Sequence, residues 1–182
     1  MKRYADDYEI QIDLDEKERE KKVAVYRGDF FIVNINEQEL IDFRKRAIFL
    51  FLFLVALHVA GGFVANRGMY AFYVAIPYVF VFLTLYFLGT GIFRIPKRKR
   101  KFHRDEVDLS FNRARKASLA LLIILIIGGV GEIFFIIFFS KSALTLEFLF
   151  LSLTLLTIGC AYWIFHLFKG VQVMPCSDEN GE

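Results

Sequence analysis

The chain has 182 residues, a net charge of +3 and a hydrophobic fraction of 56%, against about 45–50% in typical soluble domains. Together with a mean hydropathy of +0.45, this composition excludes a disordered chain, a collagen-like chain and a small disulfide-rich scaffold. Charged residues still make up 24% of the chain, but nearly all of them lie outside four long apolar runs. That distribution is typical of an integral membrane protein.

The first 46 residues predict a small β-rich unit ahead of the apolar runs. Tyr8–Leu14 alternates apolar and polar residues without a break, which is the period of a half-buried strand. Lys22–Tyr26 and Phe30–Ile35 follow, and the short Gly-containing segment between them is typical of a hairpin. We therefore expect a three-stranded β-meander. Because three strands are about the minimum for independent stability, its apolar side chains should rest on another surface.

A helix is predicted to begin directly after the meander. Asn36 and Glu39 have the residue types of the N-cap and N3 positions of a capping box. The helix is expected to continue through Leu40 and Phe43 into the first apolar run. The N-terminal unit is therefore predicted to be a meander plus a juxtamembrane helix.

Four apolar runs follow, each close to the ~20 residues that a helix needs to cross a bilayer. They are Ala47–Ala65, Tyr70–Phe93, Ala117–Phe139 and Ala143–Phe168. Short connections join the first run to the second and the third to the fourth, which predicts two helical hairpins. The predicted fold class is an all-α integral membrane protein, a bundle of four transmembrane helices with a small β-rich N-terminal unit.

This organisation divides the chain into five parts. They are the N-terminal unit (1–46), the first transmembrane hairpin (47–93), a basic loop (94–116), the second transmembrane hairpin (117–168) and a C-terminal tail (169–182).

Basic residues predict the orientation of these parts. Three cations, Arg44 to Arg46, precede the first run, ten Lys and Arg residues lie within Arg94–Lys116, and Lys169 follows the fourth run. The two other connections carry one cation each, Arg67 and Lys141. Because cytoplasmic loops of membrane proteins are enriched in Lys and Arg, both termini and the basic loop are predicted to be cytoplasmic. The expected location is the cytoplasmic membrane, as a multi-pass protein.

Five consecutive cations form the most basic stretch: Lys97, Arg98, Lys99, Arg100 and Lys101. One interpretation is that they only hold the loop on the cytoplasmic side. The other is that they also bind anionic lipid or an acidic partner. Since the stretch lies between two apolar runs, nucleic-acid binding is disfavoured.

Three polar side chains are predicted to meet inside the bundle: His58, Tyr78 and Glu132. Each lies eight residues from a predicted outer boundary, about 12 Å deep at 1.5 Å per residue. Each also shares a helical face with small residues, which mark close helix–helix contacts. We expect His58 and Glu132 within hydrogen-bonding or one-water reach, with Tyr78 nearby, either as packing contacts or as a proton carrier. Glu147, about one turn inside the fourth run, is expected to snorkel towards the membrane surface.

The sequence predicts no catalytic residue, metal ligand or cofactor site. The two cysteines, Cys160 and Cys176, share no metal-ligand motif, and no nucleophile–base or phosphate-binding motif occurs. The favoured function is a non-catalytic accessory or assembly protein that binds a membrane-protein partner through the meander and the basic loop. The alternative is a small proton- or ion-coupled transporter, working as a self-associated oligomer, that uses His58 and Glu132.

Overall fold

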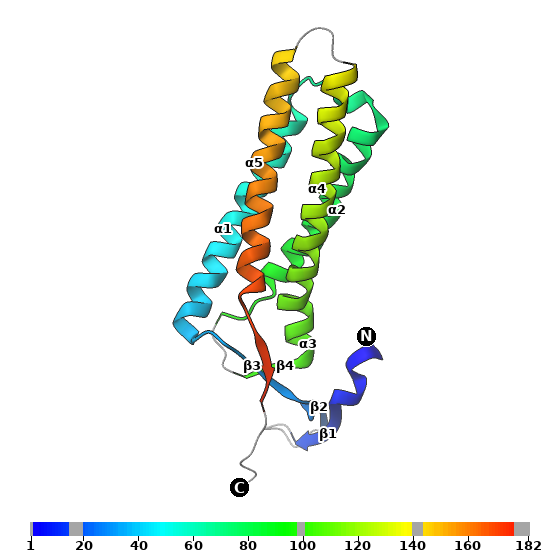
Figure 1. Cartoon of the computed structure of the whole chain (residues 1–182). Coiled ribbons are helices and arrows are strands. Elements are labelled where there is room, and N and C mark those ends of the chain that lie inside the picture. The colour runs from blue at the N-terminus through cyan, green and yellow to red at the C-terminus, as the bar shows by residue number, and fades with distance from the viewer. Residues whose placement is uncertain (1, 15–19, 98–100, 140–143, 177–182) are drawn as a thin grey trace.

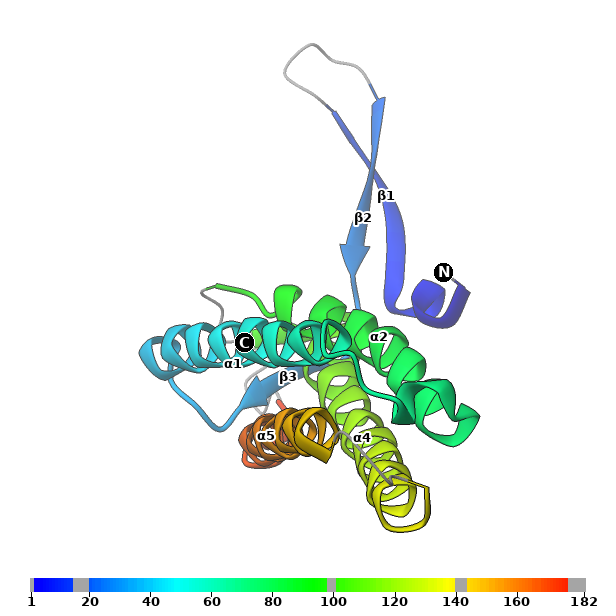
Figure 2. The same cartoon turned by 90° about the horizontal axis from the view of Figure 1, so that it is seen from above.

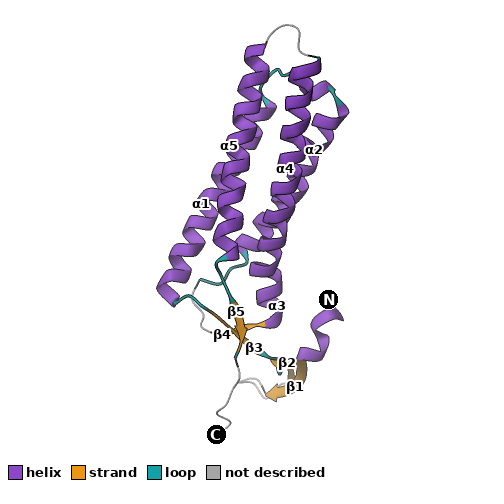
Figure 3. Cartoon of the chain, viewed as in Figure 1, coloured by secondary structure: helices purple, strands orange, loops and turns teal. Residues whose placement is uncertain are grey.

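Four long helices form an elongated bundle in the computed structural model, which describes residues 2–14, 20–97, 101–139 and 144–176 (Figure 1). They are α1 (Glu37–Gly62), α2 (Phe72–Phe93), α4 (Arg113–Phe138) and α5 (Leu144–Lys169). Short 3₁₀ turns at Lys2–Asp7 and Gly68–Tyr70 precede the first strand and α2. The strands all gather at one end of the bundle, where the two described chain ends also lie (Figures 1 and 3).

Three helical segments among the described residues are long and apolar enough to cross a membrane. They are Phe72–Phe93, Arg104–Phe138 and Thr145–Lys169. Most of the residues in their apolar stretches face away from the bundle rather than into it. Apolar residues on the outer surface of the bundle suit a lipid surrounding, because a helix that is apolar all round needs an apolar neighbour on every side.

Helix α1 is as long as α4 but is not among these three segments. Its first ten residues, Glu37 to Arg46, include six charged side chains. The apolar part, Ala47–Gly62, therefore spans about 24 Å at 1.5 Å per residue, somewhat short of a full hydrocarbon core. The start of α1 is as predicted: the Asn36 side chain accepts from the Glu39 N–H at 2.8 Å, and the Glu39 carboxylate accepts from the Asn36 N–H at 2.9 Å.

The predicted three-stranded meander is wrong. Strands β1 (Tyr8–Leu14) and β2 (Glu20–Tyr26) form a separate antiparallel hairpin, with Tyr8 opposite Tyr26. Strand β3 (Phe30–Val33) turns away and becomes the centre of a second antiparallel sheet, in the order β4-β3-β5. Its neighbours are β4 (Lys101–His103) from the basic loop and β5 (Val173–Pro175) from the C-terminal tail.

Burial explains why β3 takes these partners. Val33 and Phe102 of the second sheet are buried in the same apolar cluster as Phe43 and Phe168, which lie at the ends of α1 and α5. Strand β3 thus gains two hydrogen-bonded neighbours and a share of the apolar core. The β1–β2 hairpin offers only one neighbour and no core, so the second sheet is the better arrangement.

Much of the predicted basic loop is helical. Helix α3 (Arg104–Val107) runs through a π-helical turn (Asp108–Asn112) directly into α4, so this helical segment begins well before the apolar run. The reason is an amphipathic pattern hidden among the charges. Val107, Phe111 and Ala114 recur at helical spacing, and all three are buried.

Two glycines set the close approach of α2 and α4. A Cβ at Gly91 would lie 2.9 Å from the backbone nitrogen of Ala114, and a Cβ at Gly131 would lie 2.9 Å from the carbonyl oxygen of Tyr73. Side chains larger than hydrogen do not fit at such distances, so both helices depend on glycine here. Tyr73 precedes Pro77 by four residues, and proline has no N–H for that carbonyl. The close Gly131 backbone therefore lies against an oxygen that lacks its usual helical partner.

Candidate functional site

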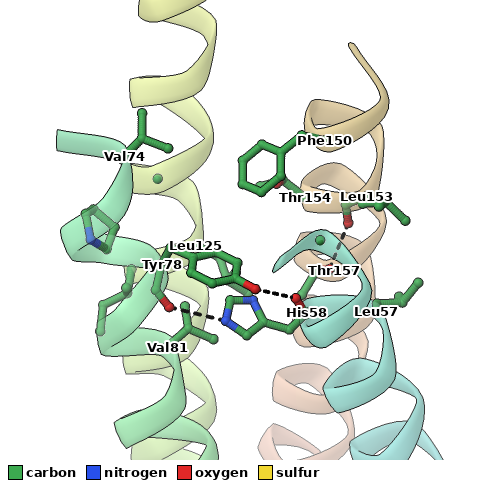
Figure 4. Close-up of a pocket in the computed structure, with 14 residues that line it drawn as sticks. Leu57, His58, Val74, Tyr78, Val81, Leu125, Phe150, Leu153, Thr154 and Thr157 are labelled. Atoms are coloured by element: carbon green, nitrogen blue, oxygen red, sulfur yellow. Dashed lines mark hydrogen bonds between the residues drawn. The ribbon is translucent and has the colours of Figure 1, made fainter. Parts of the chain in front are cut away.

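The four long helices meet around a small cavity in the bundle (Figure 4). Its volume is about 30 Å³, which suits a single water molecule rather than a substrate. The polar side chains on its wall are His58 from α1, Tyr78 from α2, and Thr154 and Thr157 from α5. Helix α4 contributes Gly128 to the wall. The hydroxyl of Thr157 bonds to the Leu153 carbonyl of its own helix at 2.7 Å.

His58 and Tyr78 form a reciprocal pair beside this cavity. The Tyr78 hydroxyl donates to the His58 carbonyl oxygen at 2.8 Å, and His58 Nε2 lies 3.2 Å from the Tyr78 carbonyl oxygen (Figure 4). Since a carbonyl oxygen only accepts, this contact assigns the imidazole proton to Nε2. The two rings also stack, with centroids 4.2 Å apart. Each residue thus holds the other in place and joins α1 to α2.

Glu132 does not join this pair but lies with Glu147, nearer the end of the bundle opposite the sheets. The two carboxyl groups interact with each other, and Asn66 from the α1–α2 connection faces Glu132. All three side chains are buried, with exposed fractions of 0%, 1% and 2% for Glu132, Glu147 and Asn66. The expectation that Glu147 snorkels to the surface is therefore wrong.

The α1–α2 connection folds inward and covers the two carboxyl groups. The Arg67 N–H donates to Glu147 Oε1 at 3.1 Å, and the Gly68 N–H donates to Asn66 Oδ1 at 2.5 Å. Gly68 itself lies so close that any Cβ there would collide with Glu132 Oε2. Sequence reasoning treated this connection as a plain outer turn, so it missed both Glu147 and Asn66 as partners of Glu132.

The basic stretch is only partly described. Lys97 is exposed, Lys101 lies in β4, and Arg98, Lys99 and Arg100 fall outside the described residues. The Lys101 ammonium lies 5.9 Å from the centre of the Phe30 ring, within range of a cation–π contact. At least this cation takes part in holding the second sheet together.

The β1–β2 hairpin projects away from the bundle but is fixed at its base (Figure 2). There the Tyr26 ring stacks on His103 with centroids 4.1 Å apart, and its hydroxyl accepts from the Arg104 N–H at 3.1 Å. Tyr8 packs edge-on against Tyr26, with ring centroids 5.2 Å apart. Burial raises the pKa of Tyr26, while burial and the nearby Asp105 carboxylate raise the pKa of Tyr8, so both hydroxyls keep their protons.

Further along the hairpin, apolar side chains are open to solvent. Ile10 of β1 is 69% exposed and Val23 of β2 is 36% exposed. Neither strand has a second hydrogen-bonded neighbour among the residues that the structure describes. A two-stranded ribbon with two free edges and exposed apolar side chains is a surface to which another strand adds readily.

Within the described parts of the chain, no three His, Cys, Asp or Glu side chains cluster in a way that would hold a metal ion. No protein-family model matches the chain, and comparisons with curated proteins and with solved structures found no match.

Proposed function

We propose that this protein is a non-catalytic accessory subunit of the cytoplasmic membrane, which crosses the bilayer four times and binds a partner protein through the β1–β2 hairpin. The observation that carries the proposal is the hairpin itself, which is anchored at Tyr26 and His103 yet extends beyond the rest of the molecule. Its partner is a protein that adds a β-strand to one free edge, because backbone groups along that edge are the hairpin's main unused binding capacity.

Two features support four membrane crossings. Helix α1 packs alongside α5 in the bundle, and the described chain ends lie at the same end of it, as an even number of crossings requires (Figure 1). The sheet end also holds most of the described cations, among them Arg44 to Arg46 and those from Lys101 to Lys116, which favours the cytoplasm for that end. The exposed Lys97 on the same end is placed to contact anionic lipid headgroups.

The alternative of a carrier that uses His58 and Glu132 is less well supported. His58 is engaged with Tyr78, and Glu132 lies with Glu147 under the α1–α2 connection. From the cavity towards the sheet end, the buried core is lined mainly by Leu, Ile, Val and Phe side chains. A carrier needs polar groups along a path, so this core offers a proton or ion little to bind.

The orientation is tested with cysteine labelling. Tyr70 is 93% exposed at the end opposite the sheets, so a cysteine in Tyr70→Cys should react with an impermeant maleimide in intact cells. The native Cys176 lies beside the sheet and should react only after lysis. Labelling of Cys176 in intact cells would reverse the proposed orientation.

Partner binding is tested by photo-crosslinking from the hairpin. A photoreactive amino acid at Ile10 and, separately, at Val23 should give one discrete crosslinked protein of the same mass from both positions. The same amino acid at Met174 is the control, because Met174 is 50% exposed on β5 but lies outside the hairpin. Deleting residues 1–26 spares β3 and should abolish the complex while leaving the thermal stability of the bundle within a few degrees of wild type.

Two results would contradict docking through the hairpin. One is crosslinking to lipid alone from Ile10 and Val23, since that would place the hairpin at the membrane surface. The other is a truncated protein that still forms the complex in equal yield. Crosslinking to a second copy of this chain would show that the hairpin mediates self-association and does not bind a different protein.

A further inference from the structure

Buried polar atoms without partners concentrate at one place in this bundle. Among the described side chains, six buried nitrogen or oxygen atoms lack a hydrogen bond, and four of them belong to Glu132, Glu147 and Asn66. They are both carboxyl oxygens of Glu132, Glu147 Oε2 and Asn66 Nδ2. These atoms lie near one another, but no hydrogen bond joins them. A buried polar atom without a hydrogen bond is costly, so a cluster of four indicates that a hydrogen-bond donor is missing here.

The geometry orients these atoms towards one another. Asn66 Oδ1 accepts from the Gly68 N–H, which turns the Nδ2 amide group of Asn66 towards Glu132. Glu147 Oε1 accepts from the Arg67 N–H, which leaves Glu147 Oε2 on the side of Glu132. Gly68 closes the space above Glu132, since a Cβ at this position would force the Glu132 carboxyl group to move. The site is therefore small, enclosed and lined by oxygen atoms with one amide donor.

We propose that Glu132 and Glu147 form a proton-binding site, in which the two carboxyl groups share one proton beneath the α1–α2 connection. The shared proton supplies an O–H donor between one oxygen of Glu132 and Glu147 Oε2. Asn66 Nδ2 then donates to the other oxygen of Glu132. One proton and a small approach of Asn66 thus satisfy all four atoms, whereas two charged carboxylates side by side in an apolar bundle repel each other.

A proton fits this site better than a metal cation. The Asn66 amide presents its N–H₂ group to the carboxyl pair, while its oxygen is already used by Gly68. Hard cations such as Ca²⁺ require about six to eight oxygen ligands, and the three free carboxyl oxygens here are too few. Few other charged residues lie on the described segments next to the pair. Helix α2 carries no charged residue, and Arg67 is the cation of the α1–α2 connection.

This site stands independently of the proposed docking function, because it lies at the opposite end of the bundle from the β1–β2 hairpin. The test is difference infrared spectroscopy on the full chain in lipid nanodiscs as pH is raised. A shared proton should give the C=O stretching band of one protonated carboxylic acid per chain, which disappears at high pH. Glu132→Gln and Glu147→Gln should each remove the band completely, because the amide N–H₂ of glutamine replaces the proton as the donor.

Glu9→Gln is the matched control, since Glu9 is an exposed carboxylate on the hairpin, and this variant should keep the band. Labelling of the wild-type protein with a hydrophobic carbodiimide, which attacks protonated carboxyl groups, requires no variant at all. It should modify Glu132 or Glu147 but never both in one chain. The proposal is overturned if the wild type shows no band that these two substitutions remove, or if both carboxyl groups are labelled together. Loss of the band on adding Na⁺ or Ca²⁺ at constant pH would make the site a cation site instead.

Discussion

Gly91→Leu is expected to be among the most damaging single substitutions in the bundle. The added side chain would have to enter the space occupied by the backbone of Ala114, where even a Cβ would lie 2.9 Å from the nitrogen. Because backbone cannot move aside as a flexible side chain does, α2 and α4 must separate. Overpacking of this kind costs about 1–3 kcal/mol or more of unfolding free energy. Denaturant unfolding of the purified protein in detergent measures the loss.

Gly159→Leu is the matched control for this experiment. Gly159 also lies within a long helix, α5, but among the described residues nothing apart from its chain neighbours and the backbone of its own helix lies within 4 Å of where its Cβ would be. A leucine there faces open space, so the unfolding free energy should stay within about 0.5 kcal/mol of wild type. Equal destabilisation by the two substitutions would show that glycine acts through the helix backbone and not through the α2–α4 contact.

Ile32→Pro is expected to detach the second sheet. Ile32 of β3 is paired on both sides, opposite Lys101 of β4 and Met174 of β5. Proline removes an N–H from a central strand and leaves a neighbouring carbonyl without its donor, at a cost of about 1–3 kcal/mol before any steric conflict. Limited proteolysis should then cut near β4 and β5, which the intact sheet protects.

The control for this substitution is Ile32→Ala. The Ile32 side chain is 43% exposed, so shortening it removes little buried surface and keeps the N–H. Its proteolysis pattern should match that of the wild type. If Ile32→Pro also leaves the pattern unchanged, the β4-β3-β5 sheet does not protect these segments.

Local patterns in the sequence were sufficient for part of the fold. The alternation in Tyr8–Leu14 predicts β1, and the capping box at Asn36 and Glu39 predicts the start of α1, because both signals involve neighbouring residues. The pairing of β3 could not be predicted in this way. Its partners β4 and β5 are three residues long and far away in the chain, too short to show a period.

For the candidate site too, one part could be predicted from the sequence and another part could not. Small residues on the same helical faces predicted that His58 and Tyr78 point inward, and in the structure their rings are in contact. The prediction that Glu132 lies level with His58 and Tyr78 is wrong, because their depths were counted from Asn66 and Tyr70 as if the chain left the bundle between them. Instead this connection folds inward, so Asn66 and Gly68 are buried at the level of the carboxyl pair. A tertiary contact of this kind leaves no periodic signal in the sequence.

Because β3 lies at the centre of its sheet, between β4 and β5, the sheet can be completed only late in synthesis. Strand β3 leaves the ribosome before all four long helices, β4 appears halfway, and β5 emerges only after α5. One edge of β3 therefore stays open until the last helix has been made. A ribosome that stops early leaves a nascent chain with an unpaired strand edge, which is the kind of feature that promotes aggregation. The sheet can therefore close only after the last helix has been synthesised.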